Sequence, residues 1–188
     1  MMGKARRLAA AVGLALALAP AAAQTPAAGR PPVAPVGPDP ESTTANFGDW
    51  TMRCRRLVDG QPVRRICEVA QSIQTPGAQG PIAQIAIGRI APADPLRVTV
   101  VLPPNISFPS APRVSTDEKD PQPVDLPWRR CLPGGCFADA AIDEATLRRW
   151  RALSGRGSIT FLDSSGHAIP VPMSFRGLDA ALDALAKS

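Results

Sequence analysis

Residues 47–71, FGDWTMRCRRLVDGQPVRRICEVAQ, contain two strand-forming runs on either side of the turn-forming residues 59–62. A loop of these four residues places Cys54 directly opposite Cys67 in an antiparallel pair of strands. Because side chains alternate along a strand, Trp50 shares the face of Cys54. The stretch therefore predicts a β-hairpin that is locked by a disulfide and turns one face toward a core.

The second pair of cysteines repeats this arrangement across a shorter loop. A Pro-Gly dipeptide lies between Cys131 and Cys136 and suits the centre of a type II turn, where Gly134 takes the positive φ. Four cysteines allow three connectivities, and the two registers select Cys54–Cys67 and Cys131–Cys136. A zinc site made of four thiolates is the alternative, but the long spacing of the first pair and an oxidising compartment argue against it. We expect no metal and no cofactor.

Residues 1–23 have the pattern of a secretory signal peptide. Lys4, Arg6 and Arg7 precede a short apolar run, and three alanines before Gln24 form the cleavage pattern. An uncleaved anchor is the alternative, but the apolar run is shorter than the roughly 20 residues that a spanning helix needs. The sequence predicts export to the periplasm or outer envelope, with no transmembrane segment in the mature protein.

The net charge gives little support for nucleic-acid binding. The formal charge is +5 at pH 7, and removal of the three basic residues in the signal lowers it to +2. A strongly basic surface is the usual feature of a nucleic-acid-binding domain, so we expect no nucleic-acid partner.

The remaining chain divides into a linker and one domain. Residues 24–46 are rich in proline, alanine and glycine and poor in large apolar side chains, which predicts an extended, disordered linker. Such a segment can also bind a groove-forming partner, although a passive spacer is the simpler role. Residues 47–188 are long enough for one domain with its own core.

Short runs separated by glycine and proline predict further strands. The expected strands are an Ile-rich run at 82–90 covered on both sides, an alternating run at 96–102, a short edge strand at 113–116, and a hairpin from 158–162 and 168–175. Two short helices are expected, one over 143–154 and one at the end of the chain with Leu178, Leu182 and Leu185 on one face. We expect this face to pack within the molecule, with partner binding as the alternative. The pattern favours an all-β sandwich with two peripheral helices, and a small closed barrel is the alternative.

Several short motifs resemble those of a known family. They are Phe47-Gly48-Asp49-Trp50 before Cys54, Cys67 with Gln71 after it, Leu102-Pro103, Cys131 with Gly135-Cys136 and Ala138, and Ser174-Phe175-Arg176-Gly177-Leu178. In this order, from 47 to about 185, they resemble the invasion-associated locus B (IalB) family of exported α-proteobacterial proteins. The resemblance implies an immunoglobulin-like β-sandwich in the periplasm or outer envelope. Founding members of the family are linked to host-cell invasion, and the resemblance implies no catalytic residues.

Two enzymatic alternatives follow from the residues. His167 is the only histidine, and Ser164, Ser165 and Asp163 lie beside it on the turn. Neighbours on one turn point in different directions, so a nucleophile-base pair is not expected there. A redox-active disulfide is the second alternative, because arginines precede Cys131, but the spacing exceeds Cys-x-x-Cys and no thioredoxin-like βαβ pattern surrounds it.

Arginines supply the remaining functional signal. Arg55, Arg56, Arg64 and Arg65 lie near one end of the predicted hairpin, and three more arginines (Arg148, Arg149 and Arg151) lie on the predicted helix. Guanidinium groups pair well with phosphate and carboxylate, so we expect an anion- or partner-binding surface for envelope polysaccharide, lipid headgroups or an acidic protein. The expected function is that of an exported envelope protein that acts by binding or host-surface interaction without catalysis. A periplasmic thiol-disulfide or hydrolytic enzyme is the alternative.

Overall fold

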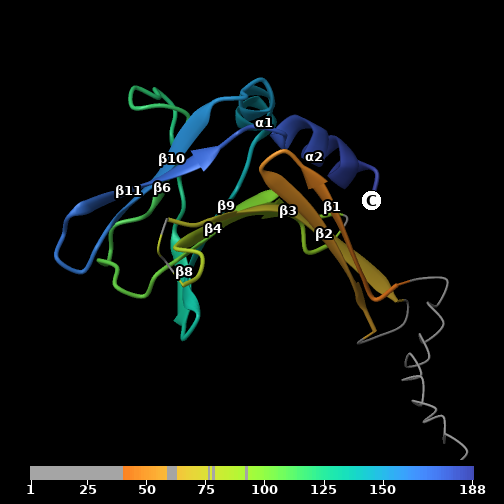
Figure 1. The fold of residues 1–188 in the computed structure, drawn as a ribbon, viewed down its shortest axis with the longest axis horizontal. Helices are drawn as coiled ribbons and strands as arrows, with labels where there is room; N and C mark the ends of the chain where they lie inside the picture. Colours follow the sequence, from red (N-terminus) through yellow and green to blue (C-terminus); the bar gives the residue numbers. More distant parts are fainter. Residues whose placement is uncertain (1–39, 59–62, 76, 78, 92) are drawn as a thin grey trace, which may run out of the picture. The chain divides into compact units, whose positions relative to one another are not determined.

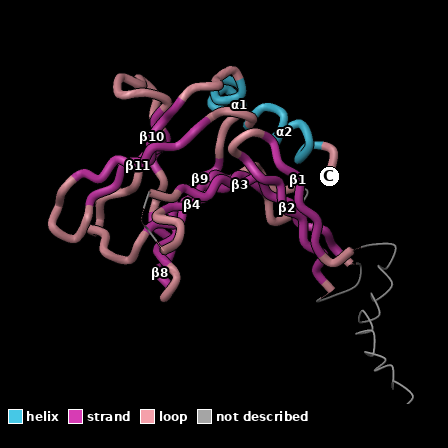
Figure 2. Tube along the Cα trace, viewed as in Figure 1, coloured by secondary structure: helices cyan, strands magenta, loops and turns pink. Residues whose placement is uncertain are grey.

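Antiparallel strand pairing builds two sheets from the part of the chain that the structure describes (Figures 1 and 2). The computed structural model describes residues 40–58, 63–75, 77, 79–91 and 93–188, all within one unit of the chain, Val36–Ser188. The predicted signal peptide and the predicted turn at 59–62 lie outside the described residues, as does the linker up to residue 39.

The first sheet has seven strands, in the spatial order β1 (Ser42–Phe47), β2 (Trp50–Leu57), β3 (Arg64–Ile73), β4 (Ala83–Gly88), β5 (Arg97–Leu102), β9 (Gly135–Ala141) and β8 (Trp128–Leu132). The second sheet has four strands, in the order β11 (Ala168–Ser174), β10 (Arg156–Leu162), β6 (Arg113–Ser115) and β7 (Val124–Asp125). Two helices complete the described elements, α1 (Glu144–Arg151) and α2 (Leu178–Ala186). The predicted all-β sandwich with two short helices is confirmed. Among the described strands β1 does not pair with β8, so the first sheet is open and the barrel alternative is wrong.

The β2–β3 hairpin has the register that the sequence predicts. Cys54 lies opposite Cys67, and the two form a disulfide. Trp50 is fully buried on the same face as Cys54. On the other face Arg53 lies opposite Glu68 and donates a hydrogen bond of 2.9 Å to it.

The second disulfide, Cys131–Cys136, closes the β8–β9 hairpin as predicted. The turn geometry differs from the prediction, because the positive φ is at Gly135 (137°) and not at Gly134. A Cβ atom on Gly135 would lie 2.7 Å from the carbonyl oxygen of Leu102 in β5. The close approach of the neighbouring strand therefore requires glycine at this position.

Alternation along the central strands decides which face of the first sheet is buried. In β5 the buried positions are Val98, Val100 and Leu102, as predicted. In β4 the buried residues are Ala83, Ile85 and Ile87, while the positions between them are half-buried. The expectation that this strand is covered on both sides is wrong. Its outer positions hold glutamine, alanine and glycine, which offer little apolar area for a second layer.

Strand β1 shows that the folded region begins before the predicted boundary. Ser42–Phe47 pairs with β2, and Ser42 lies opposite Arg55. The predicted linker, 24–46, is therefore too long at its C-terminal end. The cause is that four of the six β1 residues are exposed, so this edge strand lacks the apolar alternation by which a strand is recognised in a sequence.

The predicted edge strand at 113–116 occupies a different place in the sheet. It forms β6, which lies between β10 and β7. One true edge of this sheet is β11, which contains the exposed residues Pro170 and Pro172. Proline has no backbone N–H to offer to another strand, so it is tolerated at a sheet edge.

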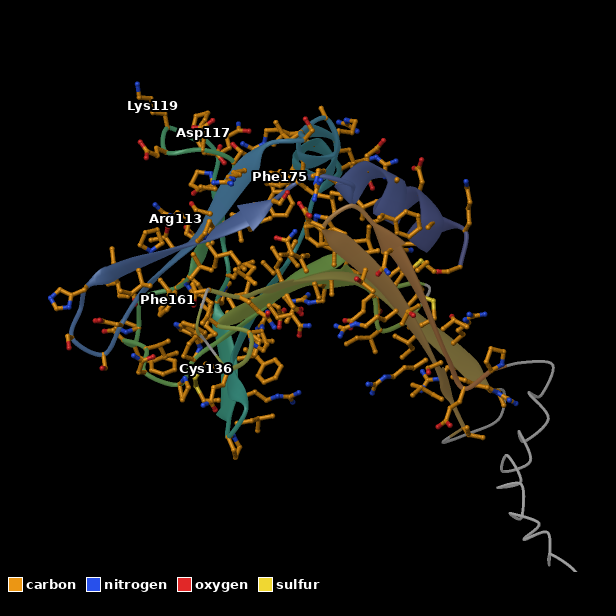
Figure 3. The ribbon with its side chains drawn as sticks, viewed as in Figure 1. Arg113, Asp117, Lys119, Cys136, Phe161 and Phe175 are labelled. Atoms are coloured by element: carbon orange, nitrogen blue, oxygen red, sulfur yellow. A yellow bond between two sulfur atoms is a disulfide. The ribbon has the colours of Figure 1, made fainter. Side chains whose placement is uncertain are left out.

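Both helices bury apolar side chains in the core, and α2 packs against β1, β2 and β3. Asp143 caps α1, and its side chain accepts a hydrogen bond of 2.6 Å from the N–H of Thr146. Trp150 of α1 stacks at a tilt on Phe175, with ring centroids 5.7 Å apart, and Figure 3 labels this phenylalanine next to the helices. The expected face of α2 (Leu178, Leu182 and Leu185) is buried within the molecule, as predicted. No helix within the described residues is long and apolar enough to cross a membrane.

A set of hydrogen bonds, which we call the inter-sheet clamp, joins the two sheets. The side chain of Gln71 in β3 is 6% exposed. Its Oε1 accepts a bond of 2.9 Å from the N–H of Ser174 in β11, and its Nε2 donates to the carbonyl oxygen of Ser174 at 3.2 Å. The indole N–H of Trp50 donates to the same oxygen at 2.9 Å. The side chains of Gln71 and Trp50 in the first sheet thus hydrogen-bond both the N–H and the carbonyl oxygen of Ser174 in the second sheet.

The loop after β1 and the segment after β11 extend this clamp. The N–H of Asp49 donates to the carbonyl oxygen of Arg176 at 3.1 Å, and the Arg176 guanidinium hydrogen-bonds the Asp49 carboxylate. That guanidinium, together with the Ser174 hydroxyl, holds the pKa of Asp49 below its ordinary value of 3.8. At Gly177 (φ 88°) a Cβ atom would lie 2.1 Å from the carbonyl oxygen of Phe47. Segments from opposite ends of the domain therefore meet backbone to backbone.

We predict that Gln71→Leu destabilises the protein although its volume is nearly kept. The substitution leaves the partly buried N–H of Ser174 without its acceptor, so the free energy of unfolding should fall by about 1–2 kcal/mol. Urea unfolding followed by circular dichroism measures this. The control is Gln84→Leu on the outer face of β4, which should change stability by less than about 0.5 kcal/mol. If both variants lost the same free energy of unfolding, the hydrogen bonds of the clamp would not be what stabilises the protein here.

We predict that Gly177→Ala is more destabilising than Gly166→Ala. Both glycines have a positive φ, 88° and 83°, but a Cβ atom on Gly166 meets nothing within 4 Å. The backbone strain is therefore similar, about 1 kcal/mol in each, and only Gly177→Ala adds the clash with Phe47. In thermal unfolding, the free energy of unfolding of Gly177→Ala should be lower than that of Gly166→Ala by at least about 2 kcal/mol. A difference near zero would show that the two segments can separate without cost.

Candidate functional site

The four arginines predicted to bind anions lie near one end of the β2–β3 hairpin, but on two faces. Strand alternation places Arg56 on the face of Cys54 and Arg65 on the face of Cys67, where the two lie directly opposite each other. Arg55 and Arg64 therefore lie on the opposite, outer face. We call residues 55–58 and 63–66 the hairpin end.

A groove of about 320 Å³ lies beside the hairpin end on the face of the disulfide. It is lined by Arg65, Ile66 and Cys67 of β3, by Arg89, Ile90 and Ala91 after β4, and by Leu185, Ala186 and Ser188 at the end of α2. Arg89, Ile90 and Leu185 come from elements far from the hairpin in sequence, so the sequence alone did not place them here. The groove combines guanidinium groups with apolar side chains.

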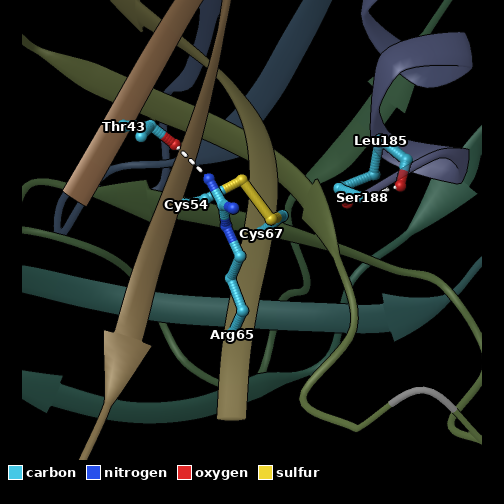
Figure 4. The surroundings of a disulfide bond; sticks show 6 residues. All are labelled: Thr43, Cys54, Arg65, Cys67, Leu185 and Ser188. Atoms are coloured by element: carbon cyan, nitrogen blue, oxygen red, sulfur yellow. Dashed lines mark hydrogen bonds between the residues drawn. A yellow bond between two sulfur atoms is a disulfide. The ribbon is translucent and has the colours of Figure 1, made fainter. Parts of the chain in front are cut away.

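Arg65 is the best-defined cation of this groove. Figure 4 shows it beside the Cys54–Cys67 disulfide, where its Nη2 donates a hydrogen bond of 2.6 Å to the Thr43 hydroxyl in β1. Within the described residues no carboxylate lies within ion-pair distance of Arg65. Its side chain is exposed, and its positive charge is available to a ligand.

Arginines on helix α1 are placed differently from the prediction. Arg149 forms an ion pair of 2.5 Å with Asp120, whose carboxylate also accepts hydrogen bonds from two backbone N–H groups of its own loop. Arg151 pairs with Asp179, at 2.9 Å, and with Asp183, both in α2. These two arginines hold the loop and the second helix in place, so their charges are not added to the hairpin end.

A second hollow, of about 200 Å³, lies against the outer face of the first sheet. Its charged lining is already paired. Asp139 accepts a hydrogen bond of 2.8 Å from Arg97 Nε and one of 3.1 Å from Arg129 Nε. Burial raises the pKa of Asp139, but the hydrogen bonds from these two arginines outweigh it, so the pKa lies below the ordinary value of 3.8. This hollow therefore offers less charge to a ligand than the groove does.

The histidine turn is organised by its aspartate. Asp163 Oδ1 accepts hydrogen bonds of 2.9 Å from the N–H groups of Ser165 and His167. The His167 ring is exposed, with Nδ1 3.5 Å from Asp163 Oδ2. Within the described residues neither Ser164 nor Ser165 hydrogen-bonds the His167 ring, so the turn does not have the geometry of a nucleophile activated by a base.

The disulfides differ in their exposure. Cys54 and Cys67 are both buried, whereas Cys131 is exposed and its partner Cys136 is buried. Next to this second disulfide the Arg130 guanidinium lies over the ring of Phe137, 5.6 Å from its centroid. In the part of the chain that the structure describes, no group of three or more His, Cys, Asp or Glu side chains is placed to hold a metal ion.

Comparisons with known proteins agree on one family. A family model described as "Invasion associated locus B (IalB) protein" matches residues 50–186. The crystal structure of invasion associated protein B from Bartonella henselae is similar to this chain, with a TM-score of 0.64 and 16% sequence identity. The match covers 77% of this chain and 96% of that one. No curated protein matches this chain in sequence.

We predict that Asp139→Asn changes how stability depends on pH. The folded-state pKa of Asp139 is depressed, so its ionised form adds stability above about pH 3.8, and this contribution is lost as the pH falls through the lowered value. The Asp139→Asn variant should be less stable than the wild type at pH 7, and the difference should shrink below pH 4. Urea unfolding between pH 2 and 7 measures this.

The control for this prediction is Asp125→Asn. Asp125 pairs with Arg113 at 2.7 Å, but both side chains are more than half exposed, so the pair contributes little to stability. This variant should follow the wild-type profile at every pH. A constant gap between Asp139→Asn and the wild type down to pH 2 would contradict the assigned pKa direction.

Proposed function

This chain belongs to the invasion associated locus B family, and on that premise we propose that it acts outside the cytoplasm by binding, without catalysis. The proposed ligands are anionic groups of the cell envelope, held at the hairpin end by its arginines. Founding members of the family are linked to host-cell invasion, and adhesion to an anionic surface is a physical event on which such a role could depend.

Two features support a location outside the cytoplasm. Both pairs of cysteines are oxidised, which is typical of proteins in oxidising compartments. The first 23 residues have the features of a signal peptide, with a basic start, an apolar run and an Ala-x-Ala pattern.

The observation that carries the proposal is the uncompensated charge at the hairpin end. Elsewhere in the described chain, arginines such as Arg97, Arg149 and Arg151 are held by aspartates. No carboxylate of the described residues is within ion-pair distance of Arg55, Arg64 or Arg65. Three exposed guanidinium groups without such partners can pair with phosphate or carboxylate groups of a ligand.

A thiol-disulfide enzyme remains the second candidate, because Cys131 is exposed and directly follows Arg129 and Arg130 in the chain. The reduction potential separates the two functions. A structural disulfide has a potential below about −300 mV, whereas exchange catalysts lie near −120 to −270 mV. A value in the second range would favour the enzyme.

We predict salt-sensitive binding to the organism's own envelope. The purified mature protein should sediment with envelope fractions at low ionic strength and be released at high salt, since exposed charges are screened over about 10 Å at 0.1 M salt. Arg64→Gln combined with Arg65→Gln should weaken the binding by roughly thirtyfold, taking about 1 kcal/mol for each arginine at an anionic surface.

The charge-matched control is Arg148→Gln combined with Arg156→Gln, because both of these arginines are exposed and lie outside the hairpin end. This double variant should bind as the wild type does. If both double variants lost binding equally, the attraction would come from net charge alone. If the wild type did not bind at all, the proposed function would be wrong.

A further inference from the structure

Among the described strands, three of the four sheet edges carry features that hinder pairing with another strand. β11 contains Pro170 and Pro172, and β7 is only two residues long. β8 carries Arg129 and Arg130, and its register with β9 shifts between Trp128 and Arg130. Proline, charge, irregular register and short length all blunt an edge strand. The fourth edge, β1, has none of these features, because its six residues pair with β2 without a break and include no proline and no charged side chain.

Strand geometry shows which backbone groups of β1 can accept another strand. The N–H of Arg56 donates a hydrogen bond of 2.9 Å to the carbonyl oxygen of Glu41, which lies opposite it one step before the start of β1. Bonded and non-bonded pairs alternate along an antiparallel ladder, so Ser42, Thr44 and Asn46 turn their N–H and carbonyl groups away from β2. We call these six groups the β1 edge. Within the described residues they hydrogen-bond no other part of the chain, and Figure 1 shows β1 at the margin of the first sheet.

Two arginines flank the start of the β1 edge, one on each face of the sheet. Arg55 lies opposite Ser42, and its exposed side chain is on the outer face. Arg65 reaches β1 on the face of the disulfide, where its guanidinium donates to the Thr43 hydroxyl at 2.6 Å (Figure 4). No carboxylate of the described residues is within ion-pair distance of either arginine. A strand added beside β1 would therefore bring one of its side chains near each guanidinium.

We propose that the β1 edge binds an extended acidic segment of an envelope protein, which pairs with β1 as an added antiparallel strand. The inference rests on the proposed function and names the ligand of two of the same arginines. An antiparallel strand exchanges two hydrogen bonds at each of the three residues of the β1 edge, so six bonds align it. Two consecutive acidic residues near its C-terminal end would lie beside Ser42 and Thr43, next to Arg55 and Arg65.

Two features select this partner over the other candidates. The β1 strand of a second copy has no acidic side chain, so pairing between copies would leave both arginines without a carboxylate. Phosphate groups and sugar acids can bind arginine. They lack the alternating N–H and carbonyl groups that the β1 edge can pair with, whereas an extended peptide has them.

The first test measures binding of the mature protein to the organism's own envelope fractions. Thr44→Pro removes one donor of the β1 edge, keeps every charge and breaks no hydrogen bond to β2. It should weaken binding by roughly tenfold or more, because the N–H is lost and the proline ring projects toward the added strand. Circular dichroism checks that the variant folds, and Asn46→Pro repeats the test at the other end of the edge.

The matched control is Ala168→Pro. It adds a proline to the exposed edge of β11, at the same alternation as Pro170 and Pro172. This variant should bind envelope fractions as the wild type does. Equal weakening by Thr44→Pro and Ala168→Pro would overturn the assignment of the partner to β1.

Protease treatment of the envelope fractions identifies the class of ligand. Digestion should abolish binding, because the partner is a protein segment. Binding that survives digestion, or that Thr44→Pro leaves unchanged, would overturn the peptide partner and leave the proposed function standing. Absence of binding by the wild type would overturn both. A dimer in analytical ultracentrifugation that Thr44→Pro dissociates would assign the edge to a second copy and overturn the acidic partner.

A synthetic probe tests the geometry directly. The peptide acetyl-Thr-Val-Thr-Glu-Glu-amide can place its two glutamates beside Ser42 and Thr43. It should slow the hydrogen exchange of the amides of Ser42, Thr44 and Asn46, and leave unchanged those of Thr43 and Ala45, which already bond to β2. The same peptide with glutamine in place of glutamate should bind roughly fivefold more weakly, since both ion pairs are lost. Absence of protection at the three amides would overturn the added strand, and equal affinity of the two peptides would overturn the role of the arginines.

Discussion

The fold depends on the hydrogen bonds of the inter-sheet clamp. Gln71 and Trp50 of the first sheet bind the backbone of Ser174 in the second, and this fixes the distance and the register between the two layers. The core between the sheets is apolar and non-directional, whereas these bonds are directional. Three of the motifs that resemble the IalB family meet at this point: Phe47-Gly48-Asp49-Trp50, Gln71, and Ser174 to Gly177. These parts of the resemblance therefore rest on residues with an architectural role.

Electrostatic pairing separates the structural arginines from those at the hairpin end. Arg176 closes the clamp on Asp49, and Arg151 joins the two helices through Asp179 and Asp183. In the β2–β3 hairpin the Cys54–Cys67 disulfide joins the two strands one pair beyond the end of β4 and one pair before the end of β1. At the hairpin end, Arg55 still pairs with Ser42 of β1, and the N–H of Arg56 donates a hydrogen bond of 2.9 Å to the carbonyl oxygen of Glu41. The disulfide and these bonds hold the exposed arginines away from the core.

Much of the architecture could be predicted from the sequence, and the reasons are local. The register of Cys54 and Cys67 follows from loop length and side-chain alternation, and the cap of α1 follows from Asp143. The features that were missed depend on residues far away in sequence. Gly135 needs its positive φ because of the Leu102 carbonyl oxygen in another strand. Strand β1 has too few apolar side chains to be recognised, and it is held by pairing with β2.

The candidate site was also predicted only in part, because some of its features are local in the sequence and others depend on distant residues. Sequence proximity grouped Arg55, Arg56, Arg64 and Arg65, and they do lie near one end of the hairpin. The predicted register together with side-chain alternation also divides them between two faces, with Arg56 and Arg65 on the face of the disulfide. The sequence could not show that loop and helix aspartates hold Arg149 and Arg151. The groove lining from α2 and from the segment after β4 depends on tertiary packing and has no local signal.

The prolines of β11 have a consequence for how copies of this chain meet while they fold. When several copies fold close together, the sheet edges of neighbouring copies can join. Pro170 and Pro172 remove two donors from this edge. Copies that collide while folding thus find no continuous ladder to extend along β11, which favours separate molecules over fibrous aggregates.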